Sequence, residues 1–190
     1  MFKAFVKKIA MAVGWVIAFP GIILFKMTKS RELFGSFGEI YSLIPSKMGV
    51  YVRACYYHRI MKKCPLDINL LYLSKITKPN TEIGHGVLIG SYCTIGLAKI
   101  GDNCAIGSRS TLLSGRRHHN FDDPKRPILA DTSAPVKIFV GDNTFIGEGS
   151  IIMADVGECC IIGAGSVVVK TIEGYSVAVG NPARVIKKRK

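Results

Sequence analysis

The chain has 190 residues, 48% of them hydrophobic, and a formal charge of +13 from 26 Lys and Arg against 13 Asp and Glu. This length suits one domain of catalytic size with an appendage, and the apolar content excludes global disorder. The positive excess favours anionic partners such as lipid headgroups and phosphorylated cofactors, whereas no aromatic and basic platform of a known type points to nucleic acid.

Residues 9–25 form an uncharged run of 17 residues with basic residues on both sides. As a helix this run would be ~25 Å long, barely enough for ~30 Å of bilayer hydrocarbon, and Pro20-Gly21 predicts a kink. No cleavage site with small residues follows before Ser30, which argues against a signal peptide. We expect an anchor that lies in or re-enters the membrane with both ends on the cytosolic side. A full span and a helix packed in a core are the alternatives.

Residues 47–63 have the pattern of an amphipathic helix. Met48, Val52, Tyr56 and Ile60 recur at helical spacing among five cations and three tyrosines. Cations and amphipathic rings together are typical of a helix that lies on an anionic membrane surface. The alternative is an ordinary amphipathic helix docked on the domain that follows.

From residue 83 to residue 170 the chain repeats a six-residue unit, which opens with an aliphatic residue and Gly and has a small residue in its fifth place. A period of six fits neither a helix nor a lone strand, but it fits a triangular coil in which each unit forms one flat side. The aliphatic and fifth-place residues should face inward, and we expect positive φ at the glycine corners. The units open at Ile83, Ile89, Ile95, Ile100, Ile106, Val140, Ile146 and Ile162.

A segment without this period, residues 114–137, interrupts the coil with three prolines and two histidines. A loop this long inside a compact repeat is often functional, and histidine suits proton transfer near neutral pH. His118 and His119 are neighbours and point opposite ways in an extended chain, so only one can be a base. The alternative is a solvated basic loop that binds phosphates through Arg116 and Arg117.

The six cysteines indicate thiols rather than bridges. Cys93 and Cys104 occupy fifth places, where a thiol is a small apolar filler, and the adjacent Cys159 and Cys160 would bridge each other only with strain. No paired C-x-x-C spacing suggests zinc. We therefore expect reduced cysteines and a compartment that faces the cytosol.

The hexads, the inserted histidine loop and the closing stretches IIGAGSVVVK (161–170) and VAVGNPARVI (177–186) resemble the hexapeptide-repeat acyltransferases. The loop SGRRHHNFDD (114–123) and the stretch MADVG (153–157) are most similar to polysaccharide O-acetyltransferases within that family. The resemblance covers residues 66–186. It implies a left-handed parallel β-helix, a homotrimer with active sites between neighbouring coils, and acetyl-CoA as co-substrate. The handedness comes from the resemblance alone, because parallel crossovers are generally right-handed.

The resemblance also implies catalytic residues in the loop. His119 would be the general base because it directly precedes the Asn-Phe-Asp-Asp stretch, and His118 is the fallback. Asp122 or Asp123 would orient the imidazole and stabilise its charged form. Asp123-Pro124 can instead simply shape a turn.

Further residues are implied for acyl-CoA. Ala164 and its flanking glycines would adjoin the pantetheine arm, and Arg184 would meet the 3′-phosphate, for which its planar fork is suited. The residues implied are Gly163, Ala164, Gly165, Val169, Lys170, Asn181 and Arg184. Two positions depart from the family's pattern: Glu148 stands where relatives often have a small polar residue, and Val169 replaces a common Thr. The alternative for Lys170 and Arg184 is that they are ordinary exposed cations.

These observations predict three parts: a helical membrane-associating region (1–65), a β-helix domain (66–186) with an inserted loop (114–137), and a basic tail (187–190). The expected function is acyl transfer from acyl-CoA to a hydroxyl of a saccharide or glycan precursor, without a metal, with the catalytic domain on the cytoplasmic side of a membrane. One alternative is a γ-type carbonic anhydrase that would use His85 with the loop histidines. Another is a non-catalytic scaffold on the membrane.

Overall fold

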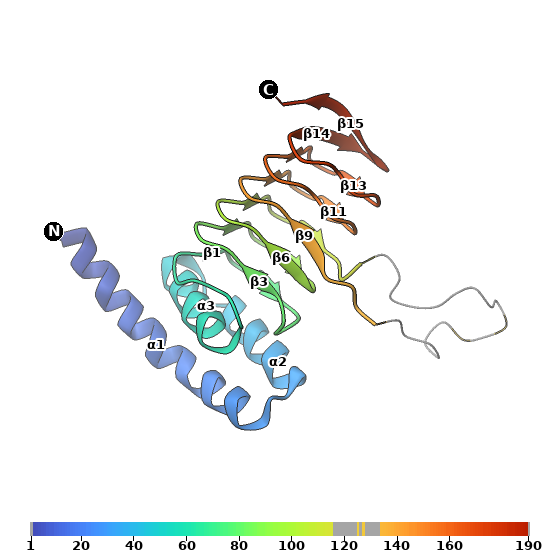
Figure 1. Ribbon diagram of the computed structural model, residues 1–190. Coiled ribbons are helices and arrows are strands. Elements are labelled where there is room, and N and C mark those ends of the chain that lie inside the picture. The colour runs from blue at the N-terminus through green and yellow to red at the C-terminus, as the bar shows by residue number, and fades with distance from the viewer. Residues whose placement is uncertain (1, 116–124, 126, 128–133, 190) are drawn as a thin grey trace.

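The computed structural model describes residues 2–115, 125, 127 and 134–189, and it shows a layer of helices at one end of a β-coil (Figure 1). The helices are α1 (Phe2–Thr28), α2 (Arg31–Ser42) and α3 (Ser46–Ile60). α2 and α3 lie between α1 and the first coil, so α1 is the outermost element at that end (Figure 1). The C-terminal hairpin closes the opposite end.

The coil consists of short strands, most of them two residues long. They are β1 (Asn69–Leu70), β2 (Lys75–Ile76), β3 (Glu82–Ile83), β4 (Leu88–Ile89), β5 (Thr94–Ile95), β6 (Ala98–Ile100), β7 (Ala105–Ile106), β8 (Thr111–Leu112), β9 (Ile138–Val140), β10 (Phe145–Ile146), β11 (Ile151–Ile152), β12 (Ile161–Ile162), β13 (Val167–Val168), β14 (Ser176–Gly180) and β15 (Ala183–Lys188).

The strands form the three faces of a prism. The first face has the order β1-β4-β7-β10-β12-β14-β15, the second β2-β5-β8-β11-β13, and the third β3-β6-β9. All pairs are parallel except β14 with β15, and isolated bridges at Val156 and Ile172 extend the third face. Up to β14, successive strands lie on different faces, which confirms the parallel triangular coil that the hexads predict.

The inward positions confirm the expected core. The aliphatic residues that open the units are nearly fully buried, and so are the fifth-place residues, including Cys93, Cys104 and Ser150. The fifth-place hydroxyls also satisfy backbone groups at the corners. Ser110 Oγ donates to the carbonyl of Gly147 at 3.0 Å and accepts from the amide of Ser150 at 3.3 Å. Small polar residues are therefore favoured at this place because they link one coil to the next.

The expectation of positive φ at the glycines that follow the aliphatic residues is wrong. Positive φ instead occurs two residues later, at residues such as Asn103, Asn143 and Gly149. The hexad glycines are required for close stacking. A Cβ on Gly107 would lie 2.5 Å from the backbone nitrogen of Glu148 in the next coil. Glycine at this place is thus a packing requirement between coils.

This difference predicts unequal costs for two glycine substitutions in adjacent corners. Gly107→Ala forces two coils apart and should lower the free energy of unfolding by about 3 kcal/mol. Gly149→Ala meets no atom within 4 Å and pays only for its φ of +67°, about 1–2 kcal/mol. Guanidinium unfolding of both variants checks this, and equal losses would contradict the stacking argument.

The helical layer differs from its expected form in α3. This helix buries Val52, Tyr56 and Tyr57 and packs between α1 and the first coil. The interpretation of residues 47–63 as a helix on a membrane surface is therefore wrong, and the docked alternative is correct. The sequence reasoning also missed α2, which begins after Ser30, whose side chain accepts from the amide of Leu33.

Arg53 of α3 is fully buried and links the helices to the coil. Its Nε donates to the carbonyl of Leu70 at 2.9 Å, and its Nη1 donates to the carbonyls of Tyr41 at 2.8 Å and Ile44 at 2.9 Å. Tyr41 lies in the last turn of α2, where the helix dipole favours a cation. Burial lowers the pKa of Arg53 to about 10, which still leaves it charged at neutral pH.

Candidate functional site

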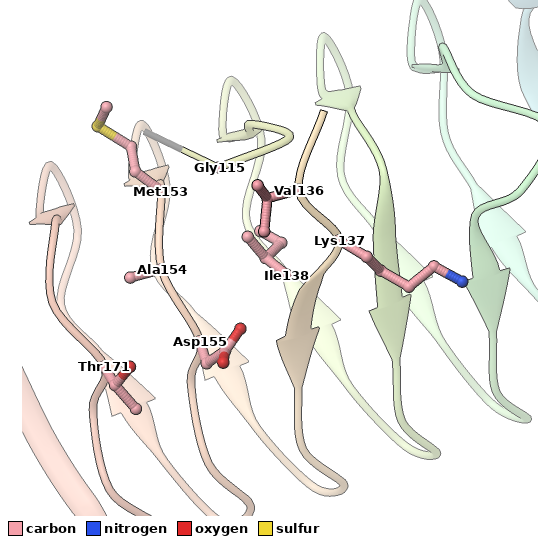
Figure 2. Close-up of a pocket in the computed structure, with 8 residues that line it drawn as sticks. All are labelled: Gly115, Val136, Lys137, Ile138, Met153, Ala154, Asp155 and Thr171. Atoms are coloured by element: carbon pink, nitrogen blue, oxygen red, sulfur yellow. The ribbon is translucent and has the colours of Figure 1, made fainter. Parts of the chain in front are cut away.

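The described part of the coil has a groove where the second face turns into the third (Figure 2). Its volume is about 330 Å³, and it is lined by Gly115, Val136, Lys137, Ile138, Met153, Ala154, Asp155 and Thr171. Gly115 and Val136 are the positions where the inserted segment leaves the coil and returns to it. The amide of Val136 donates to the carbonyl of Ser114 at 2.9 Å, so the two ends of the insertion are held together at the groove.

The groove exists because two corners of the coil are short. Ile152 is followed by the next inward residue, Val156, after four positions, and Val168 is likewise followed by Ile172. The first of these gaps is visible in the hexad spacing of the sequence, but that spacing does not reveal how the corner closes. Asp155 closes it, because its carboxylate accepts from the amide of Phe139 at 2.8 Å. Shortened corners directly after the insertion leave space beside its base.

The charged side chains around the groove have fixed partners. Lys137 forms an ion pair with Glu82 at 2.8 Å and points away from the groove in Figure 2. The hydrogen bond from Lys137 lowers the pKa of the Glu82 carboxyl, so this pair stays ionised at neutral pH. The Asp155 carboxylate also has a partner, because one of its oxygens accepts from the backbone amide of Phe139 in β9. Its side chain faces the groove (Figure 2).

The candidate catalytic residues are not placed by the structure. His118, His119, Asp122 and Asp123 lie outside the described residues. The structure does place the segment's two ends at the groove. His85 is elsewhere, at the corner between the third and first faces, with Nδ1 3.2 Å from an Asp67 carboxylate oxygen.

Six of the seven candidate cofactor residues form two groups at opposite edges of the second face, and the seventh, Arg184, lies on β15. Gly163, Ala164 and Gly165 form the corner before β13, and Gly180, next to Asn181, donates from its amide to Ser166 Oγ at 3.1 Å in the same corner. Ala164 and Gly165 are exposed, and a Cβ on Gly165 would meet no atom within 4 Å. This corner is open to a ligand that approaches the backbone.

The second group adjoins the groove. Val169 and Lys170 directly follow β13 and precede Thr171, which lines the groove, and Lys170 is exposed. Arg184 is exposed on β15, opposite Val179. The structure therefore brings Lys170 to the base of the insertion and places Arg184 at the far end of the prism.

The cysteines of the coil are poorly suited to act as nucleophiles. Burial raises the pKa of the Cys93 and Cys104 thiols, which favours the protonated form. Their Sγ atoms lie 3.2 and 3.1 Å from the carbonyl oxygens of Gly107 and Gly141. All six cysteines are free, and five are buried.

The matches to known proteins fall on the same coil segments that the structure shows. The family model described as a hexapeptide repeat of succinyl-transferase matches residues 97–115 and 137–170, the two segments on either side of the insertion. Among solved structures, a maltose O-acetyltransferase from Clostridium difficile 630 is 25% identical with a TM-score of 0.74, covering 85% of this chain and 87% of that one. That likeness extends beyond the coil into the helical layer.

Two curated relatives are also acetyl- or acyltransferases. A probable macrolide acetyltransferase from Lysinibacillus sphaericus is 44% identical over 56% of this chain and 62% of its own length. The dTDP-4-amino-4,6-dideoxy-D-glucose acyltransferase of Escherichia coli is 31% identical over 55% of this chain and 57% of its own. The chain spans little more than half the length of these relatives, and 26% of the bifunctional protein GlmU from Bartonella quintana.

These findings confirm the resemblance to hexapeptide-repeat acyltransferases and support a left-handed winding for the β-helix. The stacked hexads are the feature that this chain shares with that class of proteins. The individual roles of the site residues remain predictions.

Proposed function

We propose that the protein transfers an acetyl group from acetyl-CoA to a hydroxyl of a saccharide or glycan precursor. The observation that carries this proposal is the groove of about 330 Å³ at the base of the histidine-bearing insertion, in a coil similar to that of a maltose O-acetyltransferase. The relatives named above act, by their names, on a macrolide and on a nucleotide-linked amino sugar. A saccharide hydroxyl is the acceptor that the O-acetyltransferase likeness favours.

The reaction needs one base and no covalent enzyme intermediate. Neutral His119 takes the proton of the acceptor hydroxyl as its oxygen bonds to the thioester carbonyl carbon. The carbon–sulfur bond then breaks, and the proton passes to the departing thiolate, which yields the ester and CoA. A backbone N–H at a coil corner would stabilise the oxyanion, a contribution often worth ~3 kcal/mol. The buried, protonated thiols of Cys93 and Cys104 fit this direct transfer.

We place the CoA along the second face. In this arrangement the acyl end lies at the groove, the open corner at Gly163–Gly165 adjoins the pantetheine arm, and Arg184 meets the 3′-phosphate. Lys170, beside the groove, adds positive charge along the same path. The family resemblance implies that a neighbouring copy completes the cleft, so the proposal includes a homotrimer.

We further propose that the protein is attached to an anionic membrane surface, with its catalytic domain on the cytoplasmic side. The segment Phe5–Thr28 of α1 is long and apolar enough to cross a membrane, with a mean hydropathy of 2.0, and only 28% of its most apolar window is buried. Lys7 and Lys8 precede its apolar part, and Lys26 and Lys29 follow it, which favours anionic headgroups.

The transfer itself is tested with the full-length protein in a lipid mimic. We expect release of the CoA thiol from acetyl-CoA to depend on an added saccharide when free, nucleotide-linked and lipid-linked sugars are compared. Mass spectrometry of the product should show one added acetyl group. If no sugar of the three classes accelerates thiol release, the proposal is wrong.

The nucleotide end of the site gives a separate prediction. Arg184→Ala should raise the KM for acetyl-CoA about tenfold, because a charge-assisted hydrogen bond to phosphate is worth roughly 1.5–3 kcal/mol. The same variant should leave the KM for acetyl-dephospho-CoA, which lacks the 3′-phosphate, nearly unchanged. Lys187→Ala, on the same strand, is the matched control. An equal effect of Arg184→Ala on the KM of both thioesters would show that Arg184 does not bind the 3′-phosphate.

A further inference from the structure

The two sides of α1 differ sharply in what they contact. One side is buried against the other helices through small residues, namely Gly14, Ala18 and Gly21. A Cβ on Gly14 would lie 3.2 Å from the backbone of Tyr51, and one on Gly21 would lie 2.8 Å from the Phe37 ring. α1 is thus held along its length by α3 and α2.

A hydrogen-bonded contact strengthens this attachment in the middle of α1. The Tyr41 hydroxyl donates to the carbonyl of Ala18 at 3.3 Å and accepts from the amide of Gly21 at 3.2 Å. The helix continues through Pro20 at this point. Further along, the buried Phe25 ring lies 5.6 Å from that of Phe34.

The opposite side of α1 is a strip of exposed apolar residues. Val16, Phe19 and Met27 are 74%, 58% and 77% exposed, and no charged residue occurs between Ile9 and Phe25. Trp15, Val16 and Phe19 line a shallow apolar hollow on this side. Contiguous apolar surface of this kind marks a docking site, and its basic ends match anionic lipid rather than a neutral protein surface.

We infer that α1 lies flat in the interface of an anionic bilayer, parallel to the membrane plane, and does not cross it. This inference rests on the membrane attachment proposed above. A spanning α1 would have to leave the seam at Gly14, Ala18 and Gly21, or draw α2 with Glu32 and Glu39 into hydrocarbon, where charged groups are costly. A flat helix keeps every one of these contacts and buries only the exposed strip.

The position of α1 in the fold agrees with this orientation. α1 is the outermost layer at one end of the prism, and its helix axis runs across the direction in which the coils stack (Figure 1). The coils would therefore stand upright on the membrane. In a trimer whose three prism axes are parallel, the α1 helices of all three copies would lie at the same distance from the membrane.

The chain carries its own depth probe, because Trp15 is its only tryptophan and lies near the middle of the apolar segment. In a flat helix Trp15 lies within roughly 10 Å of the headgroups, whereas in a spanning helix it lies near the bilayer centre, ~15 Å deep. We propose to measure its fluorescence in vesicles of phosphatidylcholine and phosphatidylglycerol with bromine either near the glycerol end or near the tip of the acyl chains. Stronger quenching by the shallow bromines is expected.

The outcomes separate the orientation from the attachment. Stronger quenching by the deep bromines would overturn the flat orientation and leave the membrane attachment standing. Failure of the protein to float with vesicles, with no quenching by either lipid, would overturn the membrane attachment itself. If the protein then forms a larger oligomer in solution, the exposed apolar strip of α1 would be assigned to contact with a second copy.

A pair of charge substitutions provides the control. Val16→Glu with Phe19→Glu should lower the partition into these vesicles at least tenfold, because two side chains lose their burial in lipid. Val185→Glu with Ile186→Glu, at the far end of the prism, changes two similarly exposed apolar residues and should leave partition within twofold. Equal effects of the two variants would refute α1 as the lipid-facing surface.

Discussion

His119→Ala is expected to lower kcat by about 10²–10⁴, the range that a general base contributes, while binding of acetyl-CoA persists. The effect should fall on kcat because the imidazole acts on the acceptor proton in the transition state and is not part of the proposed cofactor path. Stopped-flow or steady-state thiol release measures the rate, and equilibrium binding of a non-hydrolysable acetyl-CoA analogue measures the affinity.

His118→Ala is the matched control in the same loop. It should retain most of the turnover, because we expect only one of the two neighbouring imidazoles to reach the acceptor. The reverse pattern, an active His119→Ala and an inactive His118→Ala, would move the base to His118. Full activity in both single variants and in the double variant would remove the histidines from the chemistry.

Arg53→Met is expected to cost on the order of 3–5 kcal/mol of unfolding free energy. The substitution removes the Arg53 donors from the carbonyls of Tyr41, Ile44 and Leu70. The Tyr41 carbonyl still accepts from the amide of Ile44 at 3.3 Å, and each of the other two, left without a partner, costs about 1–3 kcal/mol. Arg53→Lys should recover only part of the loss, because an ammonium cannot present the planar fork that reaches α2 and β1 together. Urea unfolding monitored by circular dichroism checks both variants.

Arg59→Met, on the same helix, is the control for loss of a positive charge. Arg59 is exposed, and we expect its replacement to change the stability by no more than about 0.5 kcal/mol. A similar loss for Arg53→Met and Arg59→Met would show that the buried hydrogen bonds contribute little.

The hexad spacing predicted the coil well because a six-residue period directly encodes which side chains face inward. Ile106 and Ser110, for example, are both buried as the pattern requires. The reason for the glycines was wrong because the spacing reports only that a side chain is disfavoured. It cannot separate a φ requirement from the close approach of Gly107 to the next coil.

The helical layer was predicted less well because the partners of its buried cation, Arg53, are backbone carbonyls that are distant in the sequence. Arg53 reads as a solvated cation in sequence, and only the fold brings the carbonyls at the end of α2 to its guanidinium. The groove had a visible signal, since the stretch from Ile152 to Val156 is two residues short. The spacing could not show that the gap opens beside the base of the insertion, which depends on how coils stack.

The order of layers in Figure 1 limits which acceptors can reach the groove. With lipid against α1, one helical layer about 8–10 Å thick and three to four coil steps of ~4.8 Å separate the bilayer surface from Met153 and Thr171. The resulting stand-off is roughly 20–30 Å. A monosaccharide on a lipid headgroup is too short to bridge this gap, so the protein would select either long tethered glycans or freely diffusing precursors.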